Sequence, residues 1–199
     1  MTRAAAPTYP RTIPSSGGPT EIRYMGEADR EAVLAFAREL PPHDLLFLPR
    51  DISQPKVLGA WLREIERGAM TSLLAVRAGE VLGCATIVRE PLSWSPHVAE
   101  LRVVVLPRAR GLGLGRILSE DAFALAIPLG IEKFVAQMTA DQTAAISVFE
   151  TMGYRAEALL RDHVRDRDGK KHDIVMLAHD VAAFDARLAA YGLAEPLEP

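Results

Sequence analysis

The chain has 199 residues, of which 49% are hydrophobic and 25% are charged, the ordinary composition of a soluble globular protein with one large domain. Its formal net charge of −3 gives no overall reason to expect a nucleic acid or an anionic membrane as partner. Any site for an anion must therefore be local.

One cysteine, Cys84, is present, so no disulfide can form within the chain. It lies in the apolar run 81–88, where burial raises a thiol's pKa, and we expect a core residue rather than a nucleophile. No apolar stretch reaches the ~20 residues of a membrane-spanning helix, and the N-terminus lacks a hydrophobic signal segment. These features predict a cytoplasmic location.

Residues 1–20 hold prolines and glycines without a hydrophobic pattern, which predicts a disordered tail. The folded domain is expected at 21–180. Its first part reads as a short strand and two amphipathic helices, at 21–25, 29–40 and 53–67.

Strand patterns dominate the middle of the chain. A glycine-bearing turn joins two strands into a predicted hairpin, 71–77 and 81–89. The remaining elements read in order as strand, helix, strand, helix and two strands, at 98–106, 115–129, 131–138, 142–152, 154–164 and 171–177. A C-terminal helix and tail are expected at 181–199. This order predicts a mixed α/β domain whose first half is antiparallel.

A glycine-rich segment follows the strand at 98–106 and opens a helix. It alternates three glycines with larger residues and carries three arginines: Gly111, Gly113 and Gly115, with Arg108, Arg110 and Arg116. The first turn of a helix has unpaired N–H groups and the positive end of its dipole. Glycines remove the Cβ atoms that would keep a phosphate away. The alternative is a turn without a ligand, but three glycines exceed what one turn requires, and we predict a phosphate site.

Two common phosphate motifs do not fit, because G-x-G-x-x-G would need glycine at Arg116 and a P-loop would need Gly-Lys-Ser/Thr. Residues 110–115, Arg-Gly-Leu-Gly-Leu-Gly, resemble instead the signature Arg/Gln-x-x-Gly-x-Gly/Ala of the GCN5-related N-acetyltransferase (GNAT) family. Val105-Leu106-Pro107 and Met152-Gly153-Tyr154 also look like the family's segments. The resemblance extends over residues 21–179.

The resemblance implies a single-domain α/β fold with a mixed sheet of about seven strands, an antiparallel first half and helices on both faces. At its centre, the parallel strands 98–106 and 131–138 would splay apart and hold acetyl-CoA between them. The implied activity is transfer of an acetyl or other acyl group from acetyl-CoA to a primary amine of a small molecule or protein. The amine would attack the thioester directly, and a homodimer is expected.

The coenzyme site implied by the resemblance combines three segments. Strand backbone would pair with the pantetheine arm and polarise the thioester carbonyl, and the loop amides would hold the pyrophosphate. Two further residues occupy the family's asparagine and tyrosine positions on the following helix. The full set is Val103, Val104, Val105, Arg110, Gly111, Leu112, Gly113, Gly115, Arg116, Gln142 and Phe149.

An attacking amine must first lose a proton, because an alkyl ammonium has a pKa of about 10.4. Glu100, at the start of the strand, is the expected general base. The alternative is that Glu100 is a carboxylate at the rim of the sheet with no catalytic role. His97 is a second candidate, although a lone loop histidine is more often simply solvated.

The chain departs from the family at Phe149, where the family has a tyrosine that protonates the leaving thiolate. Phenylalanine cannot donate a proton, and Tyr154 lies about 140° further around a helix, which makes it a poor substitute. Either water reprotonates the thiolate or turnover is slow. A third alternative is a non-catalytic acyl-CoA-binding sensor or regulatory module.

The five histidines show no paired ligand spacing, so the sequence predicts no metal. Asp166 to Gly169 reads as a turn between strands. Trp94 and the segment 46–48 would either line an acceptor groove or cover the core.

Overall fold

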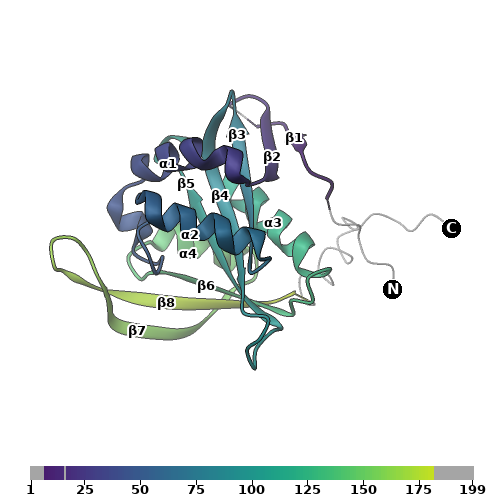
Figure 1. Ribbon diagram of the computed structural model, residues 1–199. Coiled ribbons are helices and arrows are strands. Elements are labelled where there is room, and N and C mark those ends of the chain that lie inside the picture. Colours follow the sequence, from purple (N-terminus) through teal and green to yellow (C-terminus); the bar gives the residue numbers. More distant parts are fainter. Residues whose placement is uncertain (1–6, 16, 182–199) are drawn as a thin grey trace.

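The computed structural model describes residues 7–15 and 17–181, in which eight strands form one mixed sheet (Figure 1). Their spatial order is β1-β2-β3-β4-β5-β6-β8-β7. The strands are β1 (Arg11–Ile13), β2 (Thr20–Tyr24), β3 (Met70–Arg77), β4 (Glu80–Arg89), β5 (Val98–Val105), β6 (Lys133–Thr139), β7 (Arg155–Arg165) and β8 (Lys171–Asp180). The mixed α/β architecture is confirmed, with eight strands in place of about seven.

Helices cover both faces of the sheet, as expected. They are α1 (Arg30–Glu39), α2 (Pro55–Glu66), α3 (Leu114–Ala126) and α4 (Thr143–Thr151), with 3-10 turns η1 (Glu27–Asp29), η2 (Pro42–Leu45) and η3 (Pro107–Ala109). In Figure 1, α1 and α2 lie in front of the sheet and α3 and α4 behind it. None of the described helices combines the length and apolar character needed to cross a bilayer.

The first strand corrects the prediction that residues 1–20 form a disordered tail. Arg11 pairs with Ile22 and Ile13 with Thr20 in an antiparallel ladder, and the Ile13 side chain is 6% exposed. Arg11 Nη2 donates to Asp121 Oδ1 on α3 at 2.5 Å. Three residues between prolines carry too little local signal, and the contacts that order them come from elsewhere in the chain. Residues 1–6 and the expected C-terminal helix, apart from Val181, lie outside the described residues.

The two central parallel strands separate, as the family resemblance implied. Within the described chain, β5 and β6 pair at Val98↔Lys133, Ala99↔Phe134 and Glu100↔Val135 and no further. Both strands continue beyond these pairs, but β5 stays on β4 and β6 stays on β8. The sheet is therefore open between them beyond Glu100.

An aromatic cluster holds α3 against the far half of the sheet. The Phe123 ring, 1% exposed, meets the rings of Phe134, Tyr154 and His179 edge-on at centroid distances of 5.1, 5.9 and 4.9 Å. These side chains come from α3, β6, the residue just before β7, and β8. The cluster fixes where α3 begins relative to the gap.

Replacement of Ile13 by alanine tests the corrected N-terminus. Because its side chain is buried, we expect Ile13→Ala to lower the free energy of unfolding by about 2 kcal/mol or more. Urea unfolding followed by circular dichroism measures this loss. Thr12→Ala, on the exposed face of the same strand, is the matched control and should change the free energy of unfolding little. Equal stability of the two variants would contradict the assignment of β1 as an ordered strand.

Candidate active site

A cavity of about 620 Å³ occupies the gap between β5 and β6. Its walls come from both strands, from the loop that leads into α3 and from α4. Ten of the eleven predicted coenzyme residues line it: Val103, Val104, Val105, Arg110, Gly111, Gly113, Gly115, Arg116, Gln142 and Phe149. The exception, Leu112, packs its side chain against the hydrophobic core, so only its backbone could serve.

The glycine loop presents free amides to this cavity. Gly111 and Gly113 have φ of +76° and +78°, a left-handed conformation that side chains rarely adopt, and a Cβ at either would meet nothing within 4 Å. Among the described residues, no oxygen accepts a hydrogen bond from the amides of residues 111–116. With α3 beginning at Leu114, these amides and the positive end of the helix dipole form an anion cradle.

Two arginines supply the positive charge of the cradle. Arg110 donates from Nε to the Val105 carbonyl at 3.3 Å and from Nη2 to Asp44, while Arg116 Nε reaches Glu120 at 2.8 Å. Arg108, expected to add charge here, points elsewhere. It bridges Glu39 and Glu80 at 2.7 and 3.0 Å and ties η3 to α1 and β4.

The backbone of β5 has a free side toward the gap. The Leu106 amide donates to the Leu82 carbonyl at 2.9 Å, so in the antiparallel register Val104 also directs its backbone groups to β4. By alternation, the N–H and C=O of Val103 and Val105 face the cavity. Of the three valines expected to pair with a pantetheine arm, the register therefore favours the backbone groups of Val103 and Val105 over those of Val104.

Glu100 lies at the last β5–β6 pair, where the strands begin to separate. Its two carboxylate oxygens accept from Arg102 Nε and Nη2 at 2.9 and 2.7 Å, and both side chains are mostly buried. Arg102 lines a second cavity of about 370 Å³ beneath α2, which shares Val104 with the first. Glu100 is thus near the base of the gap on the α2 side and does not line the larger cavity.

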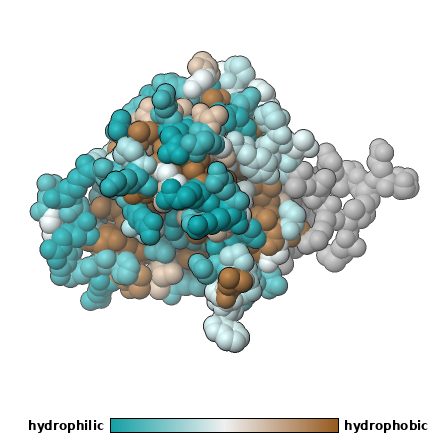
Figure 2. Space-filling model, in the orientation of Figure 1, coloured by the Kyte–Doolittle hydropathy of each residue, from teal (hydrophilic) through white to brown (hydrophobic). Residues whose placement is uncertain are grey.

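The segment 46–48 and Trp94, expected at an acceptor groove, do not come together at one cavity. Leu48 lines the cavity beneath α2 and Phe47 lines the larger one. Trp94 lines neither: it is fully exposed, at 101%, on a loop between β4 and β5 that projects from the body (Figure 2). The exposed His97 accepts the amides of Glu132 and Lys133 through its carbonyl, which is a backbone role.

Helix α4 brings Phe149, and among the described residues no tyrosine, to the wall of the cavity. Gln142 Oε1 accepts from the Thr139 amide at 3.2 Å and Phe149 packs edge-on against Tyr154 at 4.8 Å. Tyr154 is fully buried, its hydroxyl has no partner among the described residues, and burial raises its pKa. A phenol so placed cannot serve the cavity as a proton donor.

Cys84 is a core residue, as predicted. Its side chain is 1% exposed, and burial raises the pKa of the thiol to about 12. The thiolate needed for nucleophilic attack is therefore scarce near neutrality.

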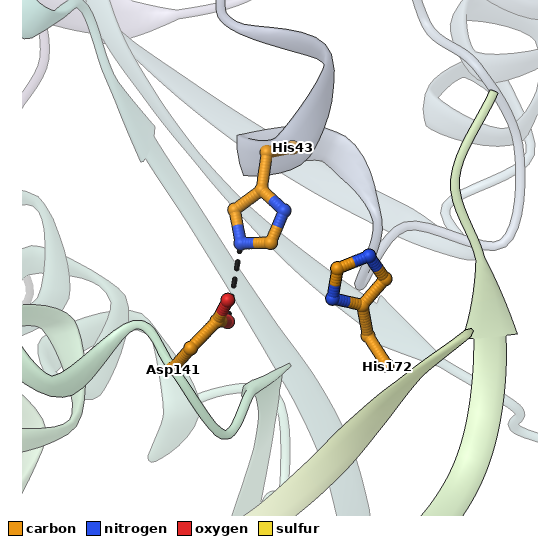
Figure 3. A group of neighbouring side chains, drawn as sticks. All are labelled: His43, Asp141 and His172. Carbon is orange, nitrogen blue, oxygen red and sulfur yellow. Dashed lines mark hydrogen bonds and ion pairs between the residues drawn. The ribbon is translucent and has the colours of Figure 1, made fainter. Parts of the chain in front are cut away.

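Three side chains that the sequence did not connect meet at the rim of the larger cavity. His43, Asp141 and His172 come from three separate segments and lie around a common point (Figure 3). The hydroxyl of Thr139, and after it His43, lower the pKa of the Asp141 carboxyl. No linear motif could reveal the group, since His43 and Asp141 are 98 residues apart.

Comparisons with known proteins agree with this geometry. The model of the acetyltransferase (GNAT) family matches residues 33–154. A search of the curated proteins found no match. Among solved structures, the ribosomal-protein-alanine N-acetyltransferase from Brucella melitensis is 26% identical, with a TM-score of 0.71 over 80% of this chain and 98% of that one.

Two further structures share the fold at lower identity. An acetyltransferase from Salmonella typhimurium, solved with its cofactor acetyl-CoA, has a TM-score of 0.70 at 20% identity and covers 90% of this chain and 97% of its own. Mutant forms of the spermidine/spermine N-acetyltransferase from Vibrio cholerae have a TM-score of 0.69 at 15% identity and cover 84% of this chain and 97% of their own.

Glutamate in place of Gly113 should abolish binding of CoA, because its side chain would enter the cradle and bring a carboxylate to the pyrophosphate position. Isothermal titration calorimetry with CoA measures the effect. Gly130→Glu is the matched control, since Gly130 also has a positive φ, +71°, with open space around its Cβ position, but does not line the cavity. Unchanged affinity of Gly113→Glu, or equal loss in both variants, would contradict the placement of the pyrophosphate.

Proposed function

Because the chain belongs to the acetyltransferase (GNAT) family, we propose that it acetylates a primary amine of a small molecule or protein, with acetyl-CoA as the acyl donor. The observation that carries the proposal is the cradle of free amides at 111–116, beside the gap between β5 and β6. This arrangement suits a diphosphate that continues into a long thin arm. The backbone groups of Val103 and Val105 line the path of that arm.

The reaction proposed is direct transfer. The amine nitrogen bonds to the acetyl carbon, the bond from that carbon to sulfur breaks, and CoA leaves as a thiolate. A β5 amide facing the gap, from Val103 or Val105, would polarise the thioester carbonyl as negative charge develops on its oxygen. The acceptor is mostly an ammonium near neutrality, because its pKa is about 10.4, so it must give up one proton before its nitrogen can attack. The nitrogen loses a second proton as the amide forms.

Glu100 is the base we propose, acting through water. Its clamp by Arg102, a residue that lines the smaller cavity, fixes the carboxylate at the base of the gap, although Glu100 itself lines neither cavity. The smaller cavity would then admit the acceptor and the larger one the coenzyme. A water molecule that relays the proton is needed, since Glu100 does not itself line the larger cavity.

Protonation of the thiolate is a separate proton transfer. Phe149 carries no proton to give, and the Tyr154 hydroxyl is buried behind it. We propose that water supplies this proton, which is easy for a leaving group with the pKa of a thiol, about 8.5.

The acceptor is identified only by class. The two named neighbours differ, one being a ribosomal-protein-alanine and the other a spermidine/spermine N-acetyltransferase, so a shared fold accommodates protein and small-molecule amines. A homodimer and a cytoplasmic location complete the proposal; the reduced thiol of a disulfide-free chain supports the location.

Steady release of CoA thiol from acetyl-CoA with a panel of amines tests the proposal. The panel contains spermidine, free amino acids and a peptide with an N-terminal alanine, and Gly113→Glu is the inactive control. We expect turnover with at least one amine. Tight binding of acetyl-CoA without turnover for any amine would favour the alternative, a non-catalytic acyl-CoA sensor.

Glu100→Gln should lower kcat/KM by about 100-fold or more if the carboxylate is the base. The loss should be greatest at low pH, where the amine is hardest to deprotonate. The pH–rate profile measures this, with Glu66→Gln, an exposed residue at the end of α2, as control. A profile identical to that of the unaltered chain would remove Glu100 from the mechanism.

Phe149→Tyr should raise kcat if thiolate protonation limits the rate, because it places a phenol at the wall of the coenzyme cavity. Phe149→Leu keeps the site apolar and is the control. A solvent isotope effect on kcat that falls in the tyrosine variant would show that the new hydroxyl carries the proton. If kcat stays unchanged, protonation by water is already fast.

A further inference from the structure

The cluster of His43, Asp141 and His172 gathers three potential metal ligands from distant parts of the chain. His43 lies in η2 between α1 and α2, Asp141 in the turn from β6 into α4, and His172 near the start of β8. One ligand atom of each lies within 4.8 Å of the others (Figure 3). Asp141 also lines the coenzyme cavity, so the cluster stands at its rim.

The distances are close to those of a tetrahedral metal site. His43 Nε2 is 3.1 Å from Asp141 Oδ1 and 3.3 Å from Thr139 Oγ1. Ligands about 2.0 Å from a zinc ion stand about 3.3 Å apart in a tetrahedron. The separation of His43 and Asp141 already matches this, and a modest movement of His172 would complete the set.

His172 is oriented as metal-binding histidines are. Its Nε2 lies 2.7 Å from Asp166 Oδ2, and its side chain is 8% exposed. Because Nε2 is engaged, Nδ1 is the nitrogen left for a ligand, and Figure 3 shows a ring nitrogen of His172 directed toward the other two side chains. A carboxylate on the second ring nitrogen fixes the tautomer and raises the basicity of the first.

The supporting carboxylate is itself held in place. Asp166 Oδ1 accepts the amides of Asp168 and Lys170 at 3.0 and 2.9 Å in the turn between β7 and β8. The rings of His43 and His172 meet edge-on with their centroids 5.1 Å apart, so both imidazoles reach the same point from different segments. One cation placed between them would use both rings together with the Asp141 carboxylate.

We propose that His43, Asp141 and His172 bind one Zn²⁺ ion. Two imidazoles and a carboxylate are a ligand set that suits zinc, and they leave a fourth position for water or another donor. The ion ties η2, the β6–α4 turn and the β7–β8 hairpin together at the rim of the coenzyme cavity. The absence of paired spacing, from which the sequence predicted no metal, does not bear on a site assembled from three separate segments.

Calorimetry on the full-length, tag-free chain, stripped with a chelator, tests the site. Titration with ZnCl₂ should show one ion per chain, and MgCl₂ should show no binding. His43→Ala and His172→Ala should each weaken zinc binding at least about tenfold, and Asp166→Asn about 10- to 100-fold. His163→Ala, an exposed histidine on β7, is the matched control and should bind as the unaltered chain does.

Cobalt provides a second readout that does not depend on acyl transfer. Co²⁺ in the site should give the intense visible absorption of a tetrahedral complex, lost on addition of Zn²⁺. If the histidine variants do not fold, Asp141→Asn tests the site instead and should weaken zinc binding. The Asp141 side chain is 57% exposed, so the fold should tolerate this change. Absence of stoichiometric zinc binding, or equal affinity in the ligand variants and His163→Ala, would overturn the proposal.

Discussion

The separation of β5 from β6 is the constraint on which the site depends. Three residue pairs hold these parallel strands together, and beyond Glu100 each strand keeps only its other neighbour. An interior strand edge normally costs free energy through unpaired backbone groups. Here we propose that a coenzyme arm pairs with the backbone groups of Val103 and with the amide of Val105, whose carbonyl accepts from Arg110 Nε.

The diphosphate cradle depends on where α3 begins. Strand β5 runs through η3 into the glycine loop, and α3 packs its buried Phe123 against an aromatic cluster from β6, β7 and β8. These contacts place the first turn of α3 beside the open part of the gap. Gly111 and Gly113 adopt left-handed backbone without a Cβ in the cradle, so its amides stay accessible.

The proposed base and the proposed metal site lie on different sides of the same gap. The Glu100–Arg102 pair stands at its base toward α2, while the His43 cluster stands at its rim beside α4. Phe149 lies in the wall of the larger cavity, and none of the described residues that line this cavity is a tyrosine. The proposed coenzyme site therefore has no phenol in its described wall to protonate the leaving group.

The sequence by itself determined the order of the elements from residue 21 onward, the buried Cys84 and the glycine loop that opens α3, while the splayed strand pair came from the family resemblance. Each of these is written in local periodicity or in a contiguous motif: alternation along a strand, glycines at a helix start, or a signature of six residues. Such signals depend only on residues close together in the chain, so they can be read without knowledge of the fold.

Only the tertiary structure decided the rest, because the deciding contacts join distant residues. β1 is ordered by β2 and by Asp121 on α3, and Arg108 turns from the phosphate loop to Glu39 and Glu80. The register with β4 decided which β5 amides face the gap. The meeting of His43 with Asp141 and His172 needs three segments folded onto one rim, and no spacing along the chain encodes that distance.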